Sequence, residues 1–211
     1  MVFSSFTFLI YFLPAFLLVY FLVPGTWKNL VVFVASLLFY YYGVREHPLY
    51  VLLLILSIAV NYMAARHMEK GKGKRRRQIC LAMGMTWNIG CLFVFKYADF
   101  FSSNLNLLFD RAGLTAAIPY IHFVLPIGIS FYTFQISSYL IDVYRRKIKA
   151  ENSILTLGTY LCMFPQLIAG PIVTYSQVET QMKQRECSIG NLEDGFREFT
   201  VGMALKVLIA N

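Results

Sequence analysis

The stretch PLYVLLLILSIAVNYMAA, residues Pro48–Ala65, is followed directly by RHMEKGKGKRRR, residues Arg66–Arg77. The first part is apolar over almost the length of about 20 residues that a helix needs to cross the ~30 Å core of a bilayer. The second part is a loop crowded with basic residues, namely Arg66, Lys70, Lys72, Lys74, Arg75, Arg76 and Arg77. Such loops stay on the cytoplasmic side, where they face anionic lipid. The pair therefore predicts a transmembrane helix that ends at the cytoplasmic surface.

The composition of the whole chain agrees with lipid as the main solvent. Hydrophobic residues make up 58% and charged residues 14% of the 211 residues, against about 45–50% and about 25% in soluble domains. The net charge of +8 arises mainly from residues between apolar stretches, so we expect membrane lipid as a partner and no nucleic acid. The four cysteines have no metal-ligand spacing, and we expect no bound metal.

The apolar stretches predict five membrane spans and one broken segment. The spans are expected at about 3–23, 27–42, 48–65, 79–95 and 127–144. With loop 66–77 inside, alternation places the N-terminus outside and returns the basic cluster Arg145–Lys149 to the inside, which is an independent check. The sixth apolar segment, 154–173, is interrupted by Pro165, Gly170 and Pro171. Because irregular backbone at membrane depth survives only inside protein or beside water, this segment is predicted to be broken or re-entrant.

The predicted fold is therefore an all-α, polytopic transmembrane bundle that forms one domain over 1–211. A further helix is expected to open near Asn191 or Asp194 and to turn apolar at Val201. It stops at Asn211 without a completed apolar stretch, so we expect the chain to be the N-terminal part of a longer protein.

The fifth span carries too many polar residues to face lipid on all sides. At about 100° per residue, Ser130 and Thr133 fall on one face, and Gln135, Ser138 and Asp142 fall on an adjoining one. One interpretation is a helix-packing face of small hydroxyls, with Asp142 paired to Arg145 or Arg146 at the membrane surface. The other is that these side chains, with Gln166 of the broken segment, line a polar tunnel for substrate.

Several stretches then point to a known family. The run from Leu125 to Gln135, LPIGISFYTFQ, resembles the motif of membrane-bound O-acyltransferases. The other matching stretches, in the same order and spacing, are 95–101 (FKYADFF), 138–145 (SYLIDVYR), 164–173 (FPQLIAGPIV) and 206–210 (KVLIA). Within that family the sequence is most similar to the membrane subunit that O-acetylates alginate, while the D-alanyl-transferring branch has a different version of the first motif.

The resemblance implies acetyl transfer from a cytoplasmic thioester donor to an exported polysaccharide such as alginate. It also implies a bacterial inner-membrane location, a periplasmic partner protein and no tightly bound cofactor. The family's essential histidine lies in a later helix, and His47, His67 and His122 do not match its motif. We therefore expect no catalytic residue within this chain, and inactivity of the chain alone. One alternative is a non-catalytic membrane component, such as part of a transporter or an assembly scaffold. Another, within the family, is D-alanyl transfer to a cell-wall polymer.

Overall fold

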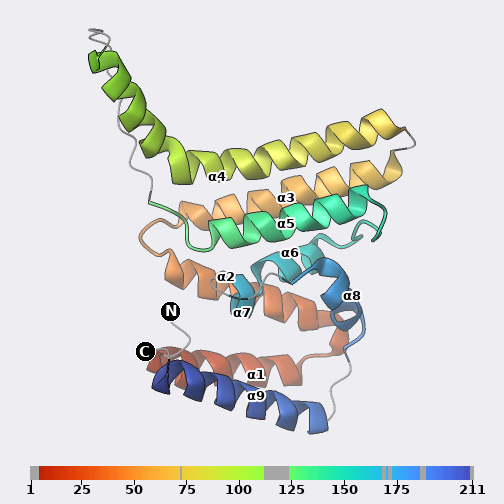
Figure 1. Cartoon of the computed structure of the whole chain (residues 1–211). Coiled ribbons are helices and arrows are strands. Elements are labelled where there is room, and N and C mark those ends of the chain that lie inside the picture. The colour runs from red at the N-terminus through yellow and green to blue at the C-terminus, as the bar shows by residue number, and fades with distance from the viewer. Residues whose placement is uncertain are drawn as a thin grey trace.

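A computed structural model describes residues 5–71, 73–111, 124–167, 170, 173–185 and 189–209. The described part of the chain is helical and contains no β-strand, which confirms the all-α prediction (Figure 1). Its elements in chain order are a π-helix η1 (Thr7–Phe12), α1 (Leu13–Leu22), a 3-10 turn η2 (Gly25–Trp27), α2 (Lys28–Gly43), α3 (Leu49–Lys70), α4 (Lys74–Arg111), α5 (Ile129–Tyr144), α6 (Ile154–Cys162), α7 (Phe164–Leu167), α8 (Tyr175–Lys183) and α9 (Ile189–Leu208).

Helix covers most of each stretch that was expected to span a membrane, but several bounds differ from the prediction. Helix α3 continues to Lys70 and α4 already begins at Lys74, so most of the predicted loop 66–77 is helical. The stretch 79–95 is only the middle of α4, which continues through 99–108 and bends along its course in Figure 1. The last helix begins at Ile189, before the predicted start, and Asn211 lies outside the described residues. By length and composition, α3 and α4 are long and apolar enough to cross a membrane, whereas the apolar stretch Thr7–Leu22 is shorter.

A proline shapes the N-terminal helix. Pro14 has no backbone N–H, and its ring crowds the carbonyl four residues earlier, so it disfavours a regular α-helical turn before it. The turns just before it, Thr7–Phe12, are wound as a π-helix, and Pro14 then occupies the first turn of α1. The wider π turn accommodates the proline within a continuous helical segment.

The core lies where α3, α4 and α5 pack on one another, with α6 against α3 and α2 against α6. Asn61 of α3 and Asn88 of α4 exchange two side-chain hydrogen bonds there, at 2.8 and 2.9 Å. Asn88 also donates to Ser137 Oγ of α5 at 3.3 Å, and Trp87 donates to Ser57 Oγ at 3.2 Å. Side-chain hydrogen bonds from Trp87 and Asn88 therefore join α4 to α3 and α5 within the core.

Both basic clusters lie at one end of the bundle, which we call the basic end and define by residues 66–77 and 143–153. Arg77 donates to the carbonyl oxygens of Val143, at 3.2 Å, and of Tyr144. Arg66 donates to the side chain of Asn152. At the opposite end, the Tyr50 hydroxyl donates to the Val124 carbonyl at 2.5 Å. Successive spans that cross in alternating directions would place both clusters at the same end, as the structure does.

Candidate functional site

The predicted break is present between α6 and α7. Helix α6 ends at Cys162, and Met163 leaves the helical region with φ −48° and ψ 115°. Pro165 sits in the first turn of the short α7, where a missing N–H costs nothing. The backbone N–H of Gly170 then bonds the Gln166 carbonyl at 3.1 Å. Pro171, the third residue predicted to break this segment, lies outside the described residues.

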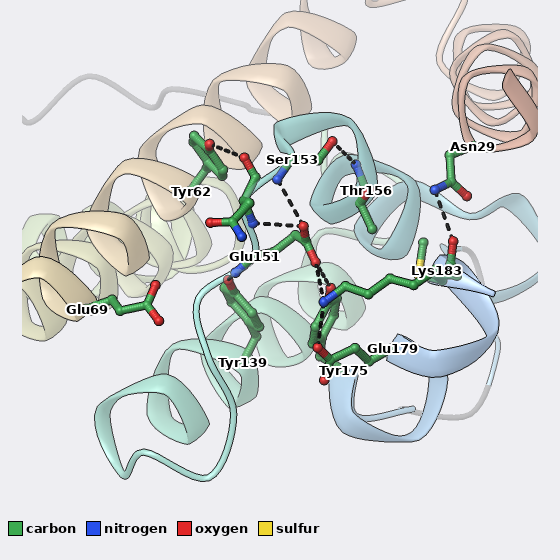
Figure 2. Close-up of polar contacts among 12 residues, drawn as sticks. Asn29, Tyr62, Glu69, Tyr139, Glu151, Ser153, Thr156, Tyr175, Glu179 and Lys183 are labelled. Carbon is green, nitrogen blue, oxygen red and sulfur yellow. Dashed lines mark hydrogen bonds and ion pairs between the residues drawn. The ribbon is translucent and has the colours of Figure 1, made fainter. Parts of the chain in front are cut away.

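The broken segment starts and finishes at the basic end, and Glu151 joins its two ends (Figure 2). The Glu151 side chain is 5% exposed. Its carboxylate accepts backbone hydrogen bonds from Asn152 at 2.8 Å and Ser153 at 2.9 Å, just before α6. It also accepts the hydroxyl of Tyr175, the first residue of α8, and pairs with Lys183 Nζ at 3.3 Å. The chain therefore enters the bundle through α6 and returns to the same end at α8.

The environment of Glu151 keeps its carboxylate ionised. Burial by itself raises the pKa of Glu151, but the hydrogen bonds from Tyr175 and the Ser153 N–H, together with the Lys183 charge, bring it below the usual value. Sequence reasoning missed this residue because it follows a basic cluster and reads as an ordinary loop acid. The one sequence feature that could have indicated it is the position of Glu151, a single acidic residue just before the apolar segment 154–173.

Aromatic rings hold the turn of the broken segment inside the protein. The ring of Phe164 lies 5.3 Å from those of Phe12 and Phe16 and 5.7 Å from that of Phe39, measured between centroids. The backbone N–H of Phe164 donates to Ser36 Oγ at 3.1 Å. Protein groups from η1, α1 and α2 thus cover the interrupted backbone.

Gly128 brings two of the family-like stretches into contact. It precedes α5 with φ 76°, in the left-handed region that favours glycine. A Cβ at this position would stand 2.3 Å from the Leu167 carbonyl oxygen. The start of α5 and the end of α7 therefore approach as closely as backbone allows, and only glycine fits between them.

A group of polar side chains also lies between α5 and the broken segment. We call it the polar seam and define it as Gln135, Ser138, Tyr160 and Gln166. The Gln135 side chain is 4% exposed. Its Nε2 donates to the Tyr160 carbonyl at 3.1 Å and to Gln166 Oε1 at 3.4 Å. The Tyr160 hydroxyl donates to the Val173 carbonyl at 2.9 Å. Ser138 donates within its own helix, to the Gln135 carbonyl at 2.8 Å.

The other predicted site residues lie elsewhere along α5. Asp142 sits near the basic end and pairs with Lys147 Nζ at 3.6 Å, so the expected pairing with Arg145 or Arg146 is wrong. The chain turns sharply after Tyr144, and this turn carries Lys147 back toward the last turn of α5. Thr133 is buried on the face beside the seam, and Ser130 is half-buried near the start of the helix.

The apolar stripe of α5 faces the core. Its members, Ile129, Tyr132, Ile136, Leu140 and Val143, are all buried. The most exposed side chains of α5 are two phenylalanines, Phe131 at 40% and Phe134 at 55% exposure. The helix therefore has two buried faces, one apolar and one polar, and its narrow outer face is apolar as well.

The seam supplies hydrogen bonds rather than proton transfer. Amide and phenol groups donate and accept without changing charge near neutral pH. His67 bonds the Met63 carbonyl at 2.8 Å on the exposed part of α3. His47 lines a cavity of about 520 Å³ at the end opposite the basic end. His122 lies outside the described residues. The seam is suited to holding and orienting a polar group.

Sequence comparison identifies relatives of the chain. The chain is 36% identical over 215 residues to the probable alginate O-acetylase AlgI of Pseudomonas aeruginosa, and 35% identical to that of Azotobacter vinelandii. It is 31% identical over 244 residues to the peptidoglycan O-acetyltransferase of Helicobacter pylori. Each match covers the whole of this chain.

The chain is homologous along its whole length to bacterial O-acetyltransferases. This confirms the resemblance to acetylating enzymes found in the sequence. The homologous region spans 40%, 42% and 45% of the lengths of these three relatives, respectively. No protein-family model matches the chain, and no solved structure matches it.

Proposed function

We propose that the protein is a membrane O-acyltransferase of the membrane-bound O-acyltransferase family that moves an acetyl group from a thioester donor to an exported polysaccharide. The observation that carries this proposal is a sequence match over the whole of this chain, and over 40% and 45% of two relatives, which are named for O-acetylation of alginate and of peptidoglycan. Both acceptors are polymers that present sugar hydroxyl groups. The chemistry that they share is formation of an acetyl ester on such a hydroxyl.

In this proposal the polar seam lines the path of the acetyl group. The two N–H groups of the Gln135 amide bond protein acceptors at 3.1 and 3.4 Å. The second distance is long for an N–H···O hydrogen bond, which is usually about 2.7–3.2 Å. The carbonyl oxygen of an acyl group is therefore a competitive acceptor for that N–H. Donors fixed in a water-poor site stabilise charge that develops on such an oxygen.

We further propose a multi-pass arrangement in the bacterial cytoplasmic membrane, with the basic end in the cytoplasm and the N-terminus outside. Support comes from the basic residues at the end of α3 and the start of α4 and from the cluster Arg145–Lys149, which lie at the same end of the bundle. Basic residues next to membrane spans favour the cytoplasmic side. In this orientation a cytoplasmic donor meets the basic end, and a periplasmic partner and the polysaccharide meet the other.

One feature favours a second candidate, a non-catalytic component of an acetylation complex. Neither described histidine lies at the seam, because His47 lines the cavity at the far end and His67 bonds the Met63 carbonyl. Such a component would hold or guide the acetyl group and leave proton transfer to another chain.

Deletion of the gene, followed by assay of ester-linked acetate on the cell-surface polysaccharide, tests the proposal. Acetate released by mild alkali should fall to background in the deletion strain and return on complementation. Unchanged ester acetate would contradict both candidates. An acetyl-transfer assay on the purified protein separates them, since turnover without any other protein supports the enzyme and rejects the component.

A further inference from the structure

A second cavity lies at the basic end, apart from the polar seam. It has a volume of about 310 Å³, and its lining residues include Arg77, Arg146, Lys149 and Glu69. The loop between α5 and α6 supplies four of its lining residues, and Gly71, directly after α3, also lines it. Three cationic residues thus line one hollow in the surface.

Arg77 is held in place by contacts that leave its charge unneutralised. Its guanidinium donates to the carbonyl oxygens of Val143 and Tyr144 at the end of α5. It also lies over the Tyr144 ring, 5.4 Å from the centroid. These partners are neutral, so Arg77 brings a fixed positive charge to the wall of the cavity.

Arg146 occupies a backbone position that usually belongs to glycine. Its φ is 61°. Its N–H bonds the Val143 carbonyl at 3.1 Å, and the N–H of Lys147 bonds the Asp142 carbonyl at 3.0 Å. This pair of bonds closes a helix in the Schellman motif, in which the left-handed residue is most often glycine. A long cationic side chain therefore occupies a backbone conformation that disfavours it. Residues in disfavoured backbone conformations concentrate at functional sites.

The acidic groups nearby are already engaged. Glu69 lines the cavity but pairs with Arg66 at 3.4 Å. Glu151 follows the lining residue Ala150, but its carboxylate is bound by Tyr175 and Lys183. Within the described part of the chain, Arg77, Arg146 and Lys149 form no ion pair with a carboxylate. The cavity therefore has an excess of positive charge.

We propose that this cavity binds a phosphate group. Guanidinium groups match the oxygens of phosphate in bidentate geometry, and lysine adds a point charge. Two kinds of molecule present this chemistry at a membrane surface, namely an anionic phospholipid headgroup and a water-soluble phosphate compound. The neighbouring basic residues at the end of α3 and the start of α4 supply further positive charge at this end of the bundle, which raises the local concentration of either; they are Arg66, Lys70, Lys74, Arg75 and Arg76. The site is independent of the acetyl-transfer proposal.

The test is a binding titration of the purified chain in an uncharged detergent. The probes are short-chain phosphatidylglycerol, for the lipid source, and inorganic pyrophosphate, for the soluble source. The key variant is Arg146→Gly, which removes the side chain but suits the left-handed backbone, so the fold is retained. The matched control is Arg145→Ala, which removes the same charge from the neighbouring residue that does not line the cavity.

We expect Arg146→Gly to weaken binding by about tenfold or more, as for loss of a charge-assisted hydrogen bond, and Arg145→Ala to leave it nearly unchanged. Binding of phosphatidylglycerol alone assigns the site to lipid, and binding of pyrophosphate assigns it to a soluble phosphate compound. Failure of both probes to bind overturns the proposal. Equal losses in the two variants also overturn it, because they indicate diffuse attraction to the basic surface.

Discussion

Replacement of Asn88 by leucine tests the packing of the three central helices. Asn88 is 3% exposed and Asn61 is fully buried. The substitution keeps a side chain of similar size but removes both bonds of the Asn61–Asn88 pair and the bond from Asn88 to Ser137. The Asn61 Oδ1 atom then remains buried among apolar groups without its donor.

The expected cost follows from these three bonds. Side-chain hydrogen bonds between membrane helices contribute about 0.6 kcal/mol each on average, so their loss costs about 2 kcal/mol. A buried polar atom left without a partner costs about 1–3 kcal/mol, and this range includes the cost worked out from the three bonds. Replacing Asn61 and Asn88 together by leucine removes the orphaned atom. The double variant should therefore lose clearly less stability than the two single variants added together.

The assay is reversible unfolding of the purified chain in mixed micelles with increasing mole fraction of a denaturing detergent. Asn104→Leu is the control, since Asn104 lies on the same helix but is exposed and bonds the Phe100 carbonyl of its own helix at 2.7 Å. The reasoning is refuted if Asn88→Leu is no more destabilising than the control. It is also refuted if the losses of the two single variants simply add in the double variant.

Three further predictions concern the broken segment and its ends. Gly128→Ala should destabilise the protein by more than about 1 kcal/mol, because the new methyl group meets the Leu167 carbonyl; a loss equal to that of Gly195→Ala, which has open space, would contradict this. Because the folded-state pKa of Glu151 is lowered, its stabilisation is complete above the unfolded-state pKa and is lost as pH falls through the folded-state value. The stability gap between wild type and Glu151→Gln, measured by unfolding from neutral to acidic pH, should therefore shrink at acidic pH, and a constant gap would argue against this. Arg146→Gly should raise the midpoint of thermal unfolding, since the left-handed backbone favours glycine, and a lowered midpoint would show that the side chain stabilises the turn.

The faces of α5 show what a sequence pattern can predict. The period of 3.6 residues placed Gln135 and Ser138 on one face, and the structure turns that face toward the broken segment. The partner across the seam was not predictable from periodicity. Gln166 lies 31 residues further along the chain, and the fold of the segment between them decides whether the two side chains meet.

Local signals failed where tertiary contacts decide the outcome. Pro165 and Gly170 predicted an interruption, and Met163 is where the helix breaks. Glu151 has no sequence motif, and its importance arises from Tyr175 and Lys183 of a separate helix. The pairing of Asp142 with Lys147 rather than with Arg145 or Arg146 depends on the Schellman turn. A left-handed arginine within that turn has no signal in the sequence.

The most direct test of the central claim is acetyl transfer by membranes of the deletion strain, complemented with the gene in which Gln135 is replaced by leucine. The assay follows labelled acetate from an acetyl thioester into polysaccharide, at matched protein abundance. Phe134→Leu is the control, because Phe134 neighbours Gln135 on α5 but is 55% exposed. If the polar seam guides the acetyl group, Gln135→Leu loses most of the transfer and Phe134→Leu retains it. Full transfer by Gln135→Leu would contradict the account.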